Sequence, residues 1–131
     1  MKEQPVRLLL VDENAAVRRA LVLRLSRARD LQIIGATGDL NTALATIKEQ
    51  HPAVVILESK RRDGAAFEFC RNVLNLASHP AIVILTSFAN EDERLSLLHL
   101  GIDKYLLKDI DTEELIRVVR QEARSQIELG A

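Results

Sequence analysis

Short apolar runs alternate with amphipathic segments along the whole chain. The clearest run, Val54–Leu57, consists of four consecutive branched or long apolar residues, which is typical of a strand buried on both faces of a parallel sheet. Other runs rich in Val, Ile and Leu have a similar length. The pattern predicts five strands, at Val6–Val11, Leu31–Thr37, Ala53–Leu57, Ala81–Leu85 and Lys104–Leu107.

Between these strands, apolar residues recur at helical spacing, and polar residues that can cap a helix stand before them. The side chains of Asn14, Asp39, Asn90 and Asp111 can each accept hydrogen bonds from the free N–H groups of a first turn. Glu93 follows Asn90 by three residues, as in a capping box. We predict helices at Ala15–Arg29, Leu40–Gln50, Ala65–Leu76, Glu91–Leu100 and Thr112–Ile127, and inward-facing residues in the first three that include Val17, Ala20, Leu21, Leu25, Leu40, Ala43, Leu44, Ile47, Phe67, Cys70, Val73 and Leu74.

Strands that alternate with helices indicate βαβ units, a parallel sheet and right-handed crossovers. The connections are short, so we expect a single domain over residues 1–131, with its core at about 6–125. The predicted fold class is α/β: one (βα)5 doubly wound, flavodoxin-like sheet with strand order 2-1-3-4-5.

Composition narrows the classes of function. The chain has 131 residues, of which 47% are hydrophobic and 28% charged, so it can bury a core. A net charge of -1 provides no general attraction to nucleic acid or to anionic membranes. The single cysteine, Cys70, cannot form an internal disulfide and favours a reducing compartment, and no apolar run approaches the length of a membrane span. We therefore expect a cytoplasmic domain that contacts neither membrane nor nucleic acid directly.

Polar residues follow four of the predicted strands at the points where they end. Asp12 and Glu13 follow the first strand, Glu58 the third, Thr86 the fourth and Lys108 the fifth. In the predicted strand order these ends lie side by side at the carboxyl edge of the sheet, which is where ligands bind in open α/β folds. Each residue alone has an ordinary structural role, but together they predict one shared site.

The chemistry of this set suits phosphoryl groups. Clustered carboxylate oxygens are good ligands for Mg²⁺. A metal ion and a lysine can neutralise phosphoryl oxygens while a hydroxyl donates to one of them. A central carboxylate can also attack phosphorus and form an acyl phosphate.

The segments LLLVDENAAVRRAL, RRDGAAFEFCR, AIVILTS and GIDKYLLKDI resemble response-regulator receiver domains, in particular those of the NarL/FixJ group. The resemblance covers nearly the whole chain. It implies a metal-binding acid pair at Asp12 and Glu13, a phosphoacceptor position at Glu58, a switch hydroxyl at Thr86, the family lysine at Lys108, and at Tyr105 a switch aromatic whose ring moves between outward and inward positions.

The chain departs from the family at the phosphoacceptor, which is aspartate in the family and Glu58 here. The extra methylene moves the carboxylate outward by roughly 1.5 Å, one C–C bond. A displacement of about 1 Å can cost a factor of 100 in rate, and Mg²⁺ tolerates little distortion of its ligand shell. We therefore expect a pseudo-receiver that is not phosphorylated by the usual route, or a phosphomimic in which Glu58 reaches Lys108 or Thr86.

A basic loop follows Glu58, with Arg62 where the family usually has proline. Lys60 and Arg61 add two further cations. Two interpretations remain open: a solvated basic loop, or a loop in which one of these cations takes the place of Mg²⁺ and neutralises Asp12, Glu13 and Glu58. Magnesium is thus a possible cofactor only.

The resemblance implies protein partners, either a histidine kinase or an output domain or regulator, and a role in transcription regulation. We expect no enzymatic turnover, and residual autophosphorylation at Glu58 stays open as an alternative. The alternatives are Mg²⁺-dependent phosphotransfer or phosphatase activity at the acid cluster, and a homodimerisation scaffold. A dimer could form through the first and fifth helices, or through the fourth helix with the fifth strand and fifth helix. The arginines of the first helix are expected to be solvated unless they meet phosphate or an acidic partner.

Overall fold

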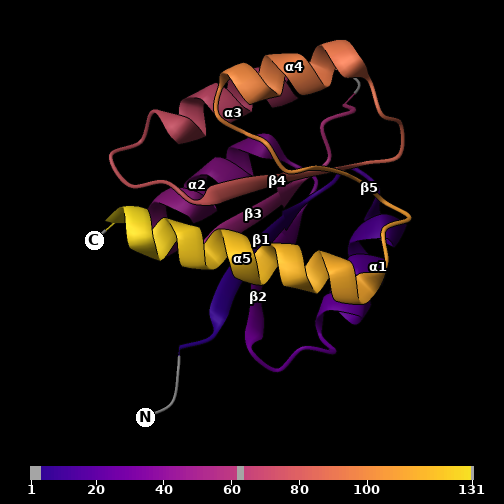
Figure 1. The fold of residues 1–131 in the computed structure, drawn as a ribbon, viewed down its shortest axis with the longest axis vertical. Coiled ribbons are helices and arrows are strands. Elements are labelled where there is room, and N and C mark those ends of the chain that lie inside the picture. The colour runs from indigo at the N-terminus through magenta and orange to yellow at the C-terminus, as the bar shows by residue number, and fades with distance from the viewer. Residues whose placement is uncertain (1–3, 62–63, 131) are drawn as a thin grey trace.

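A single five-stranded parallel sheet organises the computed structural model, which describes residues 4–61 and 64–130 (Figure 1). The strand order is β2-β1-β3-β4-β5, as predicted. Every neighbouring pair is parallel, with one register irregularity between Leu8 and Leu9 where β1 meets β2. The strands are β1 (Val6–Val11), β2 (Leu31–Thr37), β3 (Val54–Leu57), β4 (Ala81–Thr86) and β5 (Tyr105–Leu107).

Five helices connect and follow the strands, close to the predicted positions. Asn14, Asp39 and Asn90 cap α1, α2 and α4, each accepting a hydrogen bond from the backbone N–H three residues on. The first helix ends at Leu25 rather than Arg29, because the chain turns at Ser26 and Ala28 to enter β2. The helices are α1 (Ala15–Leu25), α2 (Leu40–Gln50), α3 (Ala66–Leu74), α4 (Glu91–His99) and α5 (Thr112–Gly130).

The sheet is covered on both faces, with α1 and α5 on one and α2, α3 and α4 on the other (Figure 1). Because successive strand residues point to opposite faces, Leu8 and Leu10 pack towards α1 and α5 while Leu9 and Val11 pack towards the other three helices. Fully burying one such side chain contributes about 1.5–3 kcal/mol. This double burial explains why the strands read as continuous apolar runs.

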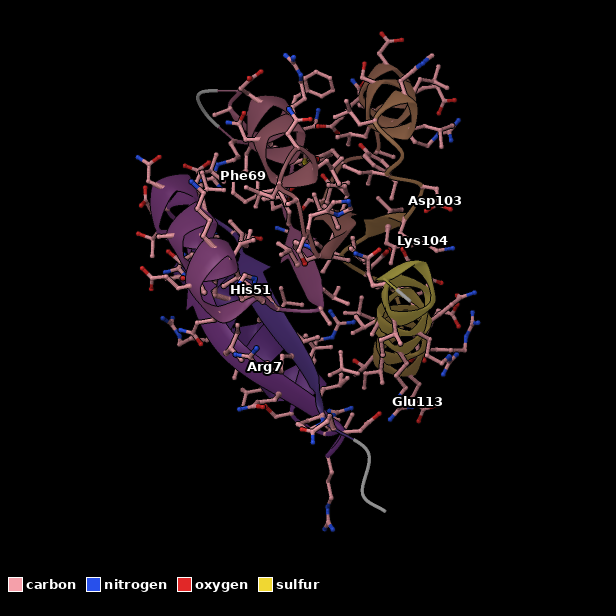
Figure 2. All side chains as sticks on the ribbon, turned by 90° about the vertical axis from the view of Figure 1, so that its left-hand side faces the viewer. Arg7, His51, Phe69, Asp103, Lys104 and Glu113 are labelled. Atoms are coloured by element: carbon pink, nitrogen blue, oxygen red, sulfur yellow. The ribbon has the colours of Figure 1, made fainter. Side chains whose placement is uncertain are left out.

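Two of the predicted core positions are wrong. Ala20 is exposed on α1, and Phe67 is 40% exposed at the start of α3, where Phe69 is buried instead. The buried stripe of α3 is Ala66, Phe69, Cys70 and Val73, a spacing that faces one side of a helix. Phe67 lies on the same helix but outside that face. Phe69, which Figure 2 labels on α3, is the phenylalanine that packs against the sheet.

The carboxyl end of α2 is tied to the sheet by an arginine. Arg7 of β1 donates to the backbone carbonyls of Gln50 and His51, and Figure 2 shows Arg7 and His51 on the same side of the molecule. His51 has a φ of 50°, which ends the helix in the left-handed region before Pro52. Within the described part of the chain, no helix is both long and apolar enough to cross a bilayer.

Two leucines on α1 provide a matched test of this packing. Leu25 is fully buried against the sheet, while Leu23 is 74% exposed. We expect Leu25→Ala to lower the free energy of unfolding by about 2–5 kcal/mol, because it leaves a cavity. Leu23→Ala should change it by less than about 0.5 kcal/mol. Urea unfolding followed by circular dichroism measures both, and equal losses would contradict the assigned face of α1.

Candidate functional site

A lysine ammonium joins two carboxylates at the carboxyl edge of the sheet. The Nζ atom of Lys108 lies 2.6 Å from Asp12 Oδ2 and 2.8 Å from Glu58 Oε1. Val11 pairs with Leu57 across β1 and β3, so the two acids that follow them are neighbours. Leu107 pairs with Thr86 at the end of β4, which brings Lys108 to the same edge. The structure thus brings together three of the predicted site residues.

The remaining carboxylate oxygens also have donors. Asp12 Oδ1 accepts from the backbone N–H of Asn14 at 2.9 Å, and Glu58 Oε2 accepts from that of Lys60 at 2.9 Å. Asp12 is only 3% exposed and Glu58 only 7%. Buried charges are tolerated when they are paired and hydrogen-bonded, and every oxygen of these two carboxylates meets that requirement.

The ammonium of Lys108 is stabilised in its charged form. Burial by itself lowers the pKa of this group, but the hydrogen bonds and charges of Asp12 and Glu58 outweigh burial and raise the pKa above its usual value. Lys108 therefore stays protonated at neutral pH and compensates part of the negative charge of the two acids.

This arrangement does not fit a magnesium ion that uses both acids. Oxygen donors suit Mg²⁺, which needs octahedral ligands at about 2.0–2.1 Å, but the ammonium of Lys108 holds the position between Asp12 and Glu58. Glu13, the third predicted ligand, is exposed. Among the residues that the structure describes, no three His, Cys, Asp or Glu side chains are grouped so that they could hold a metal.

The two predicted switch residues have local partners. Thr86 is fully buried, and its hydroxyl lies 3.4 Å from both the carbonyl oxygen and the backbone nitrogen of Phe88. The hydroxyl of Tyr105 donates to the carboxylate of Glu93 and accepts from the backbone N–H of Asn90 at 3.1 Å. Burial and the bond to Glu93 raise the pKa of Tyr105 to about 12.

Tyr105 thereby completes the amino-terminal cap of α4. Asn90 accepts from the N–H of Glu93, which is one half of the predicted capping box. In the other half, Glu93 would bond back to the N–H of Asn90. Here the Tyr105 hydroxyl stands between those two groups and bonds to both, so β5 is linked directly to the start of α4.

The side chains of Lys60 and Arg61, the two described cations of the basic loop, are not bonded to Asp12 or Glu58. Lys60 contributes its backbone N–H and its residue is exposed, while the guanidinium of Arg61 donates to the carbonyl oxygen of Gly38. Arg62 lies outside the described residues. The cation found between the acids is Lys108, not Lys60 or Arg61.

Two arginines of α1 support the site, although the sequence favoured a solvated face for them. Arg18 donates to the backbone carbonyl of Asp12 at 2.6 Å. Arg24 donates to the Thr112 hydroxyl at 2.9 Å and to the carbonyls of Lys108 and Ile110 at 3.3 and 2.5 Å. Arg24 thus anchors the backbone that carries Lys108. No spacing could have revealed this role, because its partners lie more than eighty residues away along the chain.

Comparison with known proteins gives a consistent result. The family model for the response regulator receiver domain matches residues 8–120. The DNA-binding transcriptional activator DevR/DosR of Mycobacterium tuberculosis is 33% identical over 115 residues, which cover 88% of this chain and 53% of that protein. The transcriptional regulatory protein LiaR of Bacillus subtilis is 26% identical over 124 residues, 95% of this chain and 59% of that protein. The chain therefore spans between half and three fifths of the length of these curated relatives.

Solved structures share the fold. A DNA-binding response regulator of the LuxR family from Staphylococcus aureus has a TM-score of 0.81 at 22% identity, covering 90% of this chain and 98% of the other. A response regulator receiver protein from Pseudomonas putida has a TM-score of 0.79 at 24% identity, covering 92% and 99%.

Replacing Lys108 tests the energetic role of the bridge. We expect Lys108→Met to lower the free energy of unfolding by roughly 3 kcal/mol at pH 7, because it leaves two buried carboxylates without their cation. Lys48→Met, on the exposed side of α2, should cost less than about 0.5 kcal/mol. Urea unfolding of the three proteins measures the difference, and equal losses in both variants would refute the role.

The difference in unfolding free energy between wild type and Lys108→Met should depend on pH. The folded-state pKa of Lys108 is raised, so the stability due to its charge is fully present below the unfolded value of about 10.4 and is lost as the pH rises through the folded value. The gap in unfolding free energy between wild type and Lys108→Met should therefore be constant from pH 7 to about 9.5 and shrink above it. A gap that widens at high pH would contradict the assignment.

The contact between β5 and α4 can be tested with Tyr105→Phe. Loss of the hydroxyl removes two hydrogen bonds and should destabilise the protein by about 1 kcal/mol. Hydrogen exchange of the first-turn amides of α4 should accelerate, while exchange in α2 stays unchanged. Unaltered protection at Asn90 would show that the hydroxyl does not secure this helix.

Proposed function

The chain belongs to the response regulator receiver domain family of two-component signalling, and we propose that it acts there as a pseudo-receiver. In this proposal it is an interaction module that is not phosphorylated by the usual aspartate route. The observation that carries the proposal is the Lys108 ammonium between the carboxylates of Asp12 and Glu58.

Glu58 is poorly placed to act as a nucleophile. One of its oxygens is bonded to Lys108 and the other to the backbone N–H of Lys60, and the residue is 7% exposed. A phosphoacceptor has to present a carboxylate oxygen in line with the phosphorus atom, and small misplacements cost large factors in rate. The extra methylene alters that line of approach.

The phosphomimic form of the hypothesis receives partial support from the contacts. Glu58 does reach Lys108, as a phosphomimic would. Thr86, however, bonds within its own loop, and the hydroxyl of Tyr105 bonds to the start of α4. We propose that Lys108 compensates part of the charge of Glu58, whose carboxylate bonds to Lys108 and Lys60 and not to Thr86 or Tyr105.

We further propose that the domain acts on transcription through protein partners. DevR/DosR and LiaR, which resemble this chain over half or slightly more of their length, are transcriptional regulators. The partner would be a histidine kinase, or an output domain or regulator, and the net charge of -1 favours a protein over nucleic acid as the direct contact.

A dimerisation scaffold is the second candidate, and a specific surface favours it. Leu95 and Leu98 on α4 and Leu107 on β5 are 41%, 44% and 43% exposed. These leucines offer apolar area that a second copy could bury. Mg²⁺-dependent phosphotransfer or phosphatase activity is less compatible with the site, because Lys108 stands between the two acids.

Intact-mass spectrometry after incubation with acetyl phosphate and Mg²⁺ tests the main proposal. We expect wild type to remain unmodified and Glu58→Asp to gain the mass of one phosphoryl group, because the shorter side chain restores the family's geometry. Glu58→Gln, which cannot form the acyl phosphate, is the matched control. A phosphoryl adduct on wild type that is absent from Glu58→Gln would overturn the proposal.

A further inference from the structure

The side chain of Tyr105 on β5 is held at both its ring and its hydroxyl. The ring is partly buried and packs against the core on the side of α2, α3 and α4. The hydroxyl donates to the carboxylate of Glu93 and accepts from the backbone N–H of Asn90 at 3.1 Å. The orientation of the ring therefore depends on the first turn of α4.

Glu93 supplies the stronger of the two hydrogen bonds of this hydroxyl. Three acids stand in the first turn of α4, and Glu91 among them bonds to Arg94 on the same helix, whereas Glu93 bonds across to β5. A hydrogen bond to an ionised acceptor is roughly twice as strong as one between neutral groups. A single carboxylate of α4 thus provides most of the polar attachment of Tyr105.

The polar groups of the Lys108 site are engaged elsewhere. The Thr86 hydroxyl lies 3.4 Å from both the carbonyl oxygen and the nitrogen of Phe88, and Glu58 bonds to Lys108. Within the described residues, neither Thr86 nor Glu58 is bonded to Tyr105. Burial raises the pKa of Tyr105 most, the bond to Glu93 comes next, and the charge of Glu58 is the smallest contribution to a value of about 12.

We propose that Glu93, and not the Lys108 site, sets the position of the switch aromatic in this chain. Glu93 is a positioning residue: while it accepts from Tyr105, the same hydroxyl secures the N–H of Asn90, so the start of α4 and β5 stay in one arrangement. A change of charge at Glu58 leaves the ring in place. The proposal does not depend on whether Glu58 can accept a phosphoryl group, so it can fail separately from the proposed function.

NMR of the full chain with ¹³C-labelled tyrosine measures the position of the ring. Tyr105 is the one tyrosine of the sequence, which has no tryptophan, so its signals need no further assignment. Nuclear Overhauser effects from the ring to the amides of Asn90 and the first turn of α4 report the orientation in wild type. Tyrosine fluorescence is a second readout, because a carboxylate bonded to the phenol quenches its emission.

Four variants separate the two possible sources of control. Glu93→Ala removes the acceptor and should lose the Overhauser effects and raise the emission, while Glu93→Gln, which keeps an acceptor oxygen, should retain them at lower intensity. Glu91→Gln removes the same charge from the same turn and should match wild type. Glu58→Gln removes the charge at the Lys108 site and should retain the effects in full. The amide spectrum shows whether each variant is folded.

Two results would overturn the proposal. Overhauser effects of wild-type strength in Glu93→Ala would show that the ring does not need Glu93. Their loss in Glu58→Gln would show that the Lys108 site controls the ring. If Glu93→Ala does not fold, Glu93→Gln decides: weaker effects and higher emission support the proposal, and effects equal to those of wild type overturn it.

Discussion

The ammonium of Lys108 between Asp12 and Glu58 is the interaction on which the arrangement of this site depends. Two carboxylates that are almost completely buried cannot share one sheet edge as bare anions, because burial without a partner is too costly. Two backbone N–H groups and one lysine supply the compensation. The same contacts that make the acids tolerable in the folded protein also occupy the oxygens that phosphoryl chemistry would need.

Three arginines hold the backbone around this bridge, and two of them, Arg24 and Arg61, come from distant positions in the sequence. Arg24 bonds to the carbonyls of Lys108 and Ile110, Arg18 to that of Asp12, and Arg61 to that of Gly38. Gly38 suits this role because a Cβ atom there would come within 3.2 Å of the Asp12 carbonyl oxygen and 2.8 Å of the Arg18 guanidinium. Arg18 and Arg24, which the sequence pattern places on a solvated helix face, therefore hold the backbone around an acidic site.

One methylene separates this chain from its family at the central acid. The longer side chain of Glu58 reaches Lys108 without a phosphoryl group, while Tyr105 remains bonded to Glu93 and Asn90 at the start of α4. Glu58 thus bonds to Lys108, whereas the switch aromatic Tyr105 bonds to Glu93 and Asn90. This supports the proposal of a pseudo-receiver in which Lys108, a residue of the chain itself, compensates part of the charge of Asp12 and Glu58.

Much of the fold could be predicted because it follows from local patterns. Continuous apolar runs indicated buried parallel strands, and Asn14, Asp39 and Asn90 marked helix starts through their own hydrogen bonds. The strand order in turn placed Asp12, Glu58 and Lys108 at one edge, so their convergence was predictable before any contact was known. The roles assigned to Asp12 and Glu13 as metal ligands remain predictions.

The succession of elements and the set of charged groups at the strand ends can therefore be read from the chain alone, since both depend on residues close together in it. The partner of each long side chain depends instead on how distant segments pack. Lys108 rather than Lys60 or Arg61 bonds to the acids, Arg24 bonds to the loop of Lys108, and Phe69 rather than Phe67 enters the core. The reason is physical. Long side chains can reach several partners, and packing between distant segments selects among them.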